Sequence, residues 1–339
     1  MTAPLPDLAA LGKTRRGVIG IVSMGDMGSG IARMLVAHGY AVLTNVSDRS
    51  PDTVSRAEAA GAILVSDDGV LVSYCDVILS IVPPAFAYET AERVGREVGG
   101  RGEGKGKGLL YYADLNAVSP GTVREIGGLF EGREGVRFID GCILGGPPVF
   151  VEGEGQWTKP VIPTSGDWGF GSVYGSPELA TILRARHIDG EIGKASGLKM
   201  VFAGLSKGFA AVALESVTTA REMGVLGELV RSVGELGGEG EIRRLERAVT
   251  GLGPKAGRWV REMEEIAVTH MEYGGWGGEH GIFEAAAEIY RTVATETVLG
   301  REKIGKRERG TTVEGVAVAV GEGLRKRKEK EEGGGEGEV

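Results

Sequence analysis

Lys199 is the residue of this chain whose type and setting best suit a proton-transfer step. It lies in the stretch 193–221, where apolar residues recur at the i, i+3, i+4 and i+7 positions of an amphipathic helix. We expect Ser196 to cap that helix, because its hydroxyl can accept a hydrogen bond from a first-turn N–H. The helix dipole would then disfavour a cation at Lys199 and lower its pKa, as a general acid or base requires. The alternative is a solvated surface lysine.

A glycine turn near the start of the chain has the spacing of a dinucleotide-binding fingerprint. It follows the apolar run 18–22 and precedes the helix pattern 31–38, which is the context that such a motif needs. Gly25 would let the backbone approach a pyrophosphate, and Gly28 would let the helix pack closely on the strand. Ser23 stands where the first glycine is expected. The predicted cofactor-binding residues of this turn are Ser23, Met24, Gly25, Asp26, Met27 and Gly28.

The end of the second predicted strand bears on the choice of cofactor. An NAD site usually has an acidic residue there, which binds the ribose 2′-hydroxyl. This strand instead ends at the neutral Asn45, and Arg49 and Ser50 follow, with Arg56 a few residues on. We therefore predict NADP, bound in part by Asn45, Arg49 and Ser50. NAD is the alternative, with Asp48 on the ribose and Arg49 solvated.

The pattern of the first half predicts the scaffold that positions these residues. Strand-like runs at 18–22, 41–45, 63–65, 76–82, 109–114 and 136–142 alternate with helix patterns. Such alternation predicts an α/β fold, namely a parallel, doubly wound Rossmann sheet with right-handed crossovers. Val82 and Pro83, where the fourth strand ends, are assigned to the cofactor site. From residue 193 on the pattern is helical, which predicts an all-α C-terminal domain.

The predicted organisation has four parts. A flexible N-terminus covers 1–15, and an NADP-binding Rossmann domain covers 16–192. An α-helical domain for substrate and dimerisation covers 193–324, and a disordered charged tail covers 325–339. The glycine-rich stretch 99–108 is expected to be a flexible insertion.

Composition excludes several classes of function. The chain has 339 residues, a net charge of -8 and no basic domain, so nucleic acid is not an expected partner. Two cysteines, no signal-peptide pattern and no apolar run of membrane-spanning length predict a soluble, cytoplasmic protein that does not enter a membrane. His270 and His280, near Glu272 and Glu279, lack compact metal spacing, so no metal site is predicted.

Segments in the same order and spacing resemble motifs of the β-hydroxyacid dehydrogenases, a family that includes 6-phosphogluconate dehydrogenase. They are IGIVSMGDMG from residue 19, YADLNAVSP from residue 112, DGCILGGP from residue 140 and GKASGLK from residue 193. Stretches at 258–267 and 285–290 are similar to a less characterised branch with a 6-phosphogluconate dehydrogenase-like C-terminal domain. The resemblance covers roughly residues 17 to 300 and places Lys199 at the position of the family's catalytic lysine.

The resemblance implies site residues and also shows two departures. Asn116 joins Lys199 as a catalytic candidate. The implied substrate-binding residues are Asp140, Leu144, Gly145, Gly146, Ala203 and Lys207. The family usually has serine at the position of Leu144 and asparagine at that of Ala203, so the substrate loses two expected hydrogen-bond partners. Asn116, Ser206 or Lys207 could substitute, and the last two lie roughly on the helix face of Lys199.

We therefore predict an NADP-dependent oxidoreductase of the β-hydroxyacid dehydrogenase type. Hydride would pass between nicotinamide and a small hydroxyacid or carbonyl substrate, while Lys199 takes or returns the proton. An imine reductase is one alternative, although related imine reductases commonly carry another residue in place of the lysine. A non-catalytic NADP-binding protein is the other, since Leu144 and Ala203 depart from the family. Ala- and Gly-rich helix faces in the second half predict a homodimer through the C-terminal helices.

Overall fold

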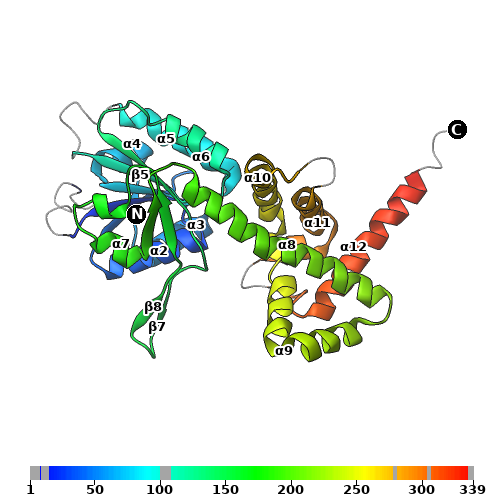
Figure 1. The fold of residues 1–339 in the computed structure, drawn as a ribbon. Coiled ribbons are helices and arrows are strands. Elements are labelled where there is room, and N and C mark those ends of the chain that lie inside the picture. Colours follow the sequence, from blue (N-terminus) through cyan, green and yellow to red (C-terminus); the bar gives the residue numbers. More distant parts are fainter. Residues whose placement is uncertain (1–7, 9–14, 100–107, 278–280, 304–306, 335–339) are drawn as a thin grey trace. The chain divides into compact units, whose positions relative to one another are not determined.

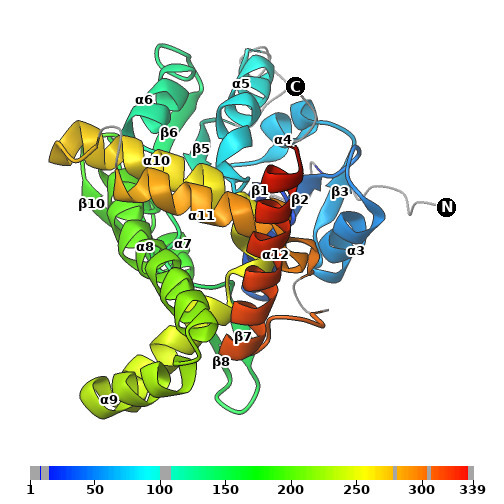
Figure 2. The same cartoon turned by 90° about the vertical axis from the view of Figure 1, so that its right-hand side faces the viewer.

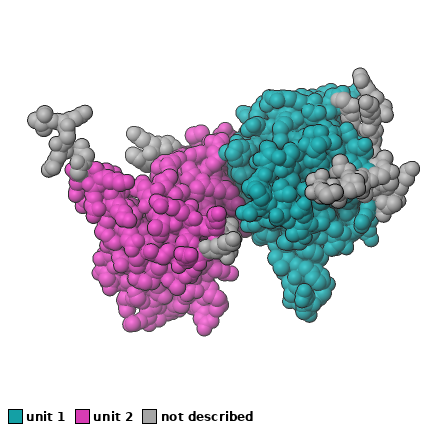
Figure 3. All heavy atoms as spheres, turned by 180° about the vertical axis from the view of Figure 1, so that it is seen from behind, with its two compact units in different colours: residues 1–199 teal, residues 200–339 magenta. Residues whose placement is uncertain are grey.

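The protein divides into two compact units, residues 1–199 and residues 200–339 (Figure 3). The computed structural model describes residue 8 and residues 15–99, 108–277, 281–303 and 307–334. Most of the predicted flexible N-terminus and of the predicted glycine-rich insertion lies outside these described residues.

Unit 1 is built on an eight-stranded sheet with the order β10-β9-β6-β5-β4-β1-β2-β3 (Figure 1). Its strands are β1 (Val18–Val22), β2 (Ala41–Asn45), β3 (Ile63–Val65), β4 (Val77–Ser80), β5 (Leu110–Asp114), β6 (Val136–Gly141), β9 (Ile162–Ser165) and β10 (Ala185–Asp189). From β3 to β6 the strands are parallel, in the order of a dinucleotide-binding fold, which confirms the predicted Rossmann sheet. β9 was not predicted, and it pairs antiparallel with β6.

Helices cover both faces of this sheet, because β1 sends alternate side chains to opposite sides. Ile19 and Ile21 enter a core covered by α2 (Asp26–Ala37), α3 (Pro51–Ala59) and α7 (Glu178–Leu183). Val18 and Val22 enter a second core covered by α4 (Asp68–Tyr74), α5 (Ala87–Val98) and α6 (Pro120–Gly128). The short 3-10 helices η1 (Pro84–Phe86) and η2 (Phe170–Ser172) complete the unit. The result is the three-layer sandwich that the alternating pattern requires.

A hairpin that the sequence did not predict projects from unit 1. Its strands are β7 (Val149–Val151) and β8 (Gln156–Thr158), which pair only with each other (Figure 1). Pro147 and Pro148 lie at its base, against Gly30 of α2, where an added Cβ would meet both prolines at 3.1 Å. The base of the β7–β8 hairpin is therefore packed on the Rossmann core.

Unit 2 is helical, as predicted. α8 (Lys194–Glu222) begins in unit 1 and continues into unit 2, which also contains α9 (Leu226–Thr250), α10 (Ala256–Gly274), α11 (Ile282–Glu296) and α12 (Val313–Gly334), with the 3-10 helices η3 (Gly253–Lys255) and η4 (Val298–Arg301). α9 is kinked at Gly238, whose φ is 74°. α10 and α11 lie side by side in both views (Figure 2). Their buried residues include Met263, Ile266, Tyr290 and Val293.

The C-terminal residues differ from the expectation. A disordered tail was predicted from residue 325, but α12 continues to Gly334. Pairs of opposite charge one helical turn apart explain the difference: Arg327 lies near Glu331, and Lys328 lies near Glu332.

α8 also differs from the expectation that no segment has the length and apolarity of a membrane span. Of the described helices it is the one long and apolar enough to cross a membrane by length and composition alone, with a mean hydropathy of 1.4 over its most apolar window. A single helix of this kind is weak evidence for a membrane span, because 44% of that window is buried inside the protein and the core helices of soluble proteins have the same composition.

Candidate functional site

The candidate site of unit 1 lies at the carboxyl edge of four neighbouring parallel strands. The fingerprint turn follows β1, and Val82 and Asn116 follow β4 and β5. Ile143 and Leu144 follow β6. The strand order reverses between β1 and β4, and in open α/β sheets ligands bind outside the carboxyl ends at such a point.

The fingerprint turn has the geometry that an approaching pyrophosphate requires. A Cβ added at Gly28 would collide with the carbonyl oxygen of Ser23, so the turn needs glycine there. A Cβ at Gly25 would meet no protein atom within 4 Å, so the space beside it is open. Ser23 has a φ of 79°, in the region that glycine favours, and thus makes the turn of the missing first glycine. Asp26 and Met27 begin α2, whose N-terminal N–H groups suit a phosphate.

The residues after β2 are partly committed to each other. Asn45 donates to Asp68 at 2.9 Å and accepts from the Ser47 hydroxyl at 2.8 Å, so its amide is engaged within the protein. Arg49 and Asp48, both exposed, form an ion pair at 3.2 Å. The Arg49 guanidinium, which suits a 2′-phosphate, and the Asp48 carboxylate, which suits a ribose 2′-hydroxyl, thus lie together.

Arg56 of α3 also lies beside the fingerprint turn, and it was not among the predicted cofactor-binding residues. Its Nε donates to the Met24 carbonyl in the fingerprint turn at 3.1 Å, and a terminal nitrogen donates to Thr53 at 3.0 Å. The Thr53 hydroxyl in turn lies 3.1 Å from that of Ser50. Sequence distance from the turn concealed this contact, although Arg56 stands near the predicted Arg49 and Ser50.

Asn116 ties the loops after β4 and β5 together. Its side-chain oxygen accepts from the Val82 N–H at 2.7 Å, and its side-chain nitrogen donates to Asp114 at 2.7 Å and to Ser80 at 3.1 Å. Burial raises the pKa of Asp114 to about 7, hydrogen bonds from Asn116 oppose that rise, and the nearby Asp140 carboxylate adds to it. Asn116 is only 2% exposed, so its amide holds the loop of Val82 and Pro83 in place.

Asp140 is the centre of a buried network that attaches the start of α8 to the sheet. One carboxylate oxygen accepts from the Ser196 hydroxyl at 2.6 Å. The other accepts from Ser165 at 2.6 Å and from the Gly193 N–H at 2.8 Å, and Asp140 is 0% exposed. Ser196 therefore donates to Asp140 from within α8, which begins at Lys194, and the predicted N-cap role of Ser196 is wrong. Both oxygens of Asp140, a predicted substrate contact, are occupied by the chain.

Lys199 lies beside the segment that follows β6. Its Nζ donates to the Ile143 carbonyl at 2.7 Å, and the side chain is half-buried. Because α8 begins at Lys194, Lys199 lies beyond the first turn in which it was predicted. Cys142 is next to it: burial raises the pKa of that thiol to about 12, and the Lys199 ammonium opposes the rise. The structure thus brings Lys199 to the carboxyl edge of β6.

The other predicted substrate residues have different surroundings. Leu144 is half-buried and bridges to Val161, while Gly145 and Gly146 are exposed. In unit 2, Ala203 is 3% exposed. Lys207 is buried, pairs with Glu262 and lies 5.4 Å from the centre of the Trp259 ring.

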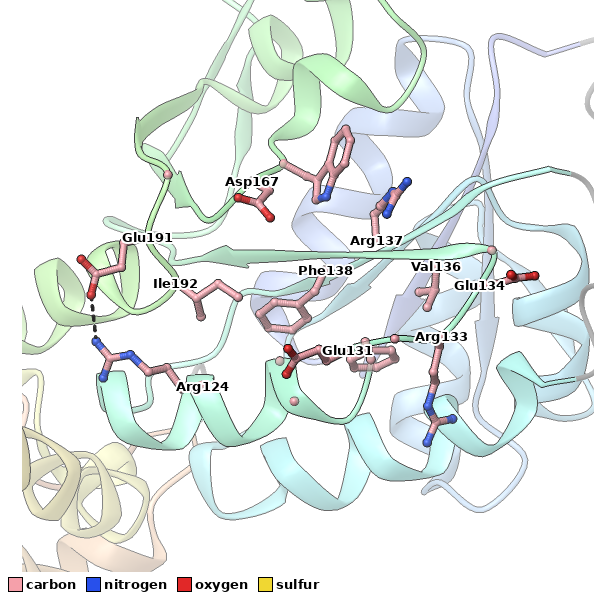
Figure 4. A pocket seen from close by; sticks show the side chains of 17 residues that line it. Arg124, Glu131, Arg133, Glu134, Val136, Arg137, Phe138, Asp167, Glu191 and Ile192 are labelled. Atoms are coloured by element: carbon pink, nitrogen blue, oxygen red, sulfur yellow. Dashed lines mark hydrogen bonds and ion pairs between the residues drawn. The ribbon is translucent and has the colours of Figure 1, made fainter.

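A cavity of about 880 Å³ elsewhere in unit 1 contains none of the predicted site residues. It lies beside β6 and α6, and an ion pair between Arg124 and Glu191 at 3.5 Å is part of its lining (Figure 4). Arginines and acidic side chains both line this cavity, so its charge favours neither an anionic nor a cationic ligand. Among the described residues no cluster of His, Cys, Asp and Glu could hold a metal, and His280 and Glu279 lie outside them.

Family models match both halves of the chain. Residues 18–153 match the NAD binding domain of 6-phosphogluconate dehydrogenase, and residues 220–293 match a domain of unknown function, DUF1932.

Relatives of the chain include both enzymes and other proteins. An uncharacterized 28.5 kDa protein of Methanothermus fervidus is 25% identical over 73% of this chain and 88% of its own length. L-threonate dehydrogenase of Cupriavidus necator is 29% identical over 40% of this chain, and the match spans only 43% of that enzyme. The cytokine-like nuclear factor N-PAC of Xenopus tropicalis is 27% identical over 61% of this chain and 36% of its own length.

Solved structures share the fold. A conserved protein of unknown function, described as structurally similar to 3-hydroxyacid dehydrogenases, has a TM-score of 0.56 and 25% identity, covering 81% of this chain and 96% of its own. A 3-hydroxyisobutyrate dehydrogenase of Mycobacterium tuberculosis has a TM-score of 0.61 at 17% identity, over 83% and 94% of the two chains. At that identity the second likeness concerns the fold alone.

Proposed function

We propose that this chain belongs to the β-hydroxyacid dehydrogenase family, since residues 18–153 match the NAD binding domain of 6-phosphogluconate dehydrogenase, and that it is an NADP-dependent oxidoreductase acting on a small hydroxyacid or the corresponding carbonyl compound. The observation that carries the proposal is the position of Lys199. Its Nζ is 2.7 Å from the Ile143 carbonyl at the carboxyl edge of a dinucleotide-binding sheet. An alcohol that loses hydride must also lose its hydroxyl proton, and we assign that proton to Lys199, whose neutral amine is the form that can take it.

The residues present fit a dinucleotide. Gly25 leaves open space beside the turn, Gly28 is sterically required, and α2 directs its N-terminus to the same place. Met24, Asp26 and Met27 would contribute backbone of the turn, and Val82 and Pro83 would flank the nicotinamide half. When bound, the cofactor would supply or accept hydride, and the chain would orient it and exclude water.

We assign preference for NADP to the corner formed by Arg49, Ser50 and Arg56. A 2′-phosphate needs charge-assisted hydrogen bonds, which a guanidinium and a hydroxyl provide. Arg56 already contacts the fingerprint turn and is linked through Thr53 to Ser50. NAD remains the alternative, in which Asp48 would bind the ribose.

In unit 1 we assign substrate contacts to the segment Leu144–Gly146 and to Lys199. Gly145 and Gly146 are exposed and present backbone to a ligand. Asp140 and Asn116 are assigned to positioning, because their polar atoms are used within the protein. Leu144 in place of serine favours a substrate with an apolar group at that point. The Lys207 ammonium is paired with the Glu262 carboxylate, so a substrate that contacted Lys207 would compete with Glu262 for it.

The experiment that tests this function measures NADPH oxidation and NADP reduction across panels of carbonyl compounds, hydroxyacids and imines. Lys199→Ala and the length-matched Lys199→Met should both lower kcat by about 10²- to 10⁴-fold, the usual worth of a general acid or base, with NADPH affinity nearly unchanged. Near wild-type turnover by either variant would remove Lys199 from the mechanism. Turnover of imines alone would favour an imine reductase instead.

A non-catalytic NADP-binding protein is the second candidate. Leu144 and Ala203 stand where the family usually has polar residues, and the relatives include a nuclear factor as well as dehydrogenases. Tight NADPH binding with no turnover on any panel would support it. In either case we propose a cytoplasmic protein that forms a homodimer through its C-terminal helices.

A further inference from the structure

We propose that the β7–β8 hairpin of one protomer docks into a groove on the helical unit of a second copy of the chain. The hairpin exposes apolar side chains that a binding partner could bury: Val149 is 56% exposed and Phe150 is 45% exposed. Its strands pair only with each other, and a two-stranded hairpin with an uncovered apolar face is at best marginally stable in water. Phe150 packs edge-on against its cross-strand partner Trp157, with 5.5 Å between ring centres, so one face of the hairpin is aromatic, and Val149 lies on the other face.

The turn of the hairpin adds negative charge to this apolar face. Glu152 and Glu154 are exposed, and within the described ranges neither carboxylate has an ion-pair partner. In the part of the chain that the structure describes, the Glu154 carboxylate accepts only from the neutral Gln156 amide, at 2.6 Å. The hairpin therefore presents an aromatic side chain followed by two uncompensated acids.

The groove has the complementary character. It lies in unit 2 among α8, α9 and α10 and has a volume of about 440 Å³, within the range of roughly 300–1,000 Å³ found for ligand pockets. Phe202, Leu205, Phe209 and Trp259 supply apolar walls, and Leu205 is 76% exposed.

Two arginines of α9 line the same groove. The Arg244 guanidinium lies 4.1 Å from the centre of the Phe209 ring and is 3.5 Å from Glu241. Arg247 donates to the Arg243 carbonyl and, in the part of the chain that the structure describes, forms no ion pair with a carboxylate. The groove thus has an aromatic floor and a cationic rim.

Charge and shape together identify the occupant. Phe150 fits the apolar floor, and Glu152 and Glu154 would then meet Arg244 and Arg247 at the rim, where a complementary pattern selects the partner. Both surfaces are on one chain, so every solution of the protein holds them at equal concentration. A two-fold related pair of protomers would use both hairpins and both grooves, as closed dimers do.

Engineered cysteines test the contact in the full chain. The natural Cys75 and Cys142 are buried, so exposed thiols placed by substitution are the ones available to diamide. Gly153→Cys, where a Cβ meets no atom within 4 Å, is mixed with Leu205→Cys, and the two thiols are oxidised to a disulfide. We expect a dimer of twice the 35.5 kDa chain mass on a non-reducing gel, and no such dimer when Arg243→Cys replaces Leu205→Cys.

The double variant Gly153→Cys/Leu205→Cys separates the possible occupants. A cross-linked dimer supports the proposal. A cross-linked monomer would assign the groove to the hairpin of the same chain, and the absence of any cross-link would leave the groove to some other partner. Either of these last two results overturns the proposal.

Charge reversal supplies the second measurement, with the cross-linking rate as the readout. Glu152→Lys/Glu154→Lys should slow formation of the dimer at least tenfold, and so should Arg244→Glu/Arg247→Glu, because each reversal opposes like charges. Combining the two reversals in one chain should restore the rate. Arg231→Glu, on the same helix but outside the groove, is the matched control and should change little. No recovery in the combined variant would contradict the pairing.

Discussion

At the scale of single residues, the site depends on where small side chains leave space. The Ser23 turn works because a backbone conformation that glycine favours is imposed on a serine by its neighbours. Gly28 leaves space that the chain itself needs, whereas the space beside Gly25 is open, and there we expect the ligand.

The variant Gly25→Val tests whether the open space beside Gly25 is used by the cofactor. A valine there meets no protein atom within 4 Å at its Cβ, so the fold should persist, whereas the pyrophosphate would lose its space. We expect NADPH binding to be abolished in a titration followed by cofactor fluorescence, with an unchanged circular dichroism spectrum. Gly28→Val is the comparison, since it should also destabilise the fold. Undiminished affinity in Gly25→Val would exclude this turn as the nucleotide site.

Cofactor preference is a second residue-scale question. Arg49→Ala should weaken NADPH binding by about 1.5–3 kcal/mol, the scale of a charge-assisted hydrogen bond, and leave NADH binding nearly unchanged. Arg56→Ala should weaken NADPH similarly, because its guanidinium is already anchored at the Met24 carbonyl. Isothermal titration with NADPH, NADH and adenosine 2′,5′-bisphosphate measures this. Equal losses for NADPH and NADH would show that neither arginine binds a 2′-phosphate.

At the scale of elements, α8 is fixed to the sheet by Asp140. The carboxylate accepts from the Gly193 N–H and from the Ser165 and Ser196 hydroxyls, and an amide in its place has only one acceptor oxygen for these three donors. Asp140→Asn should therefore loosen the start of α8 and cost about 1–3 kcal/mol of unfolding free energy. Hydrogen exchange should speed up across residues 193–199, and kcat should fall while KM and NADPH affinity stay close to wild type.

A matched control isolates this positioning effect. Tyr174→Phe removes the hydroxyl of a half-buried side chain, which donates to Asp76 at 3.1 Å in the same unit. It should lower stability without changing exchange at α8 or kcat. If both variants change kcat to the same extent, Asp140 acts only through stability.

Local signals in the sequence predicted the elements well, and non-local contacts explain the failures. Ser119, which precedes Pro120, caps α6, and its partner, the Thr122 N–H, is close along the chain. Ser196 has the same residue type, but its partner Asp140 lies 56 residues away, and no local pattern reveals it. The β7–β8 hairpin escaped prediction because its strands are short and are flanked by glycine and proline. Arg56 likewise reaches the site only through folding.

At the scale of the whole molecule, one buried carboxyl makes stability depend on pH. Burial raises the pKa of Asp114 to about 7, above the value of about 3.9 for an unfolded chain. Between these values the folded state keeps a proton that the unfolded state has lost, so stability falls as pH rises from about 4 to about 7.

Asp114→Asn removes this term. We expect the free energy of unfolding of wild type minus that of the variant to decrease with pH across this window, by on the order of 1 kcal/mol per pH unit. Urea unfolding at pH 5, 6, 7 and 8 measures the difference. Parallel curves for the two proteins would show that Asp114 does not keep its proton in the folded state.

The β7–β8 hairpin also gives the molecule an optical probe. Trp157, one of four tryptophans, lies on this hairpin against Phe150. Indole emission moves to longer wavelength as water reaches the ring, so the colour of Trp157 fluorescence reports whether the hairpin is covered. With Trp168, Trp259 and Trp276 replaced by phenylalanine, a dilution series of the unlabelled protein would follow the covering and uncovering of this single segment in real time.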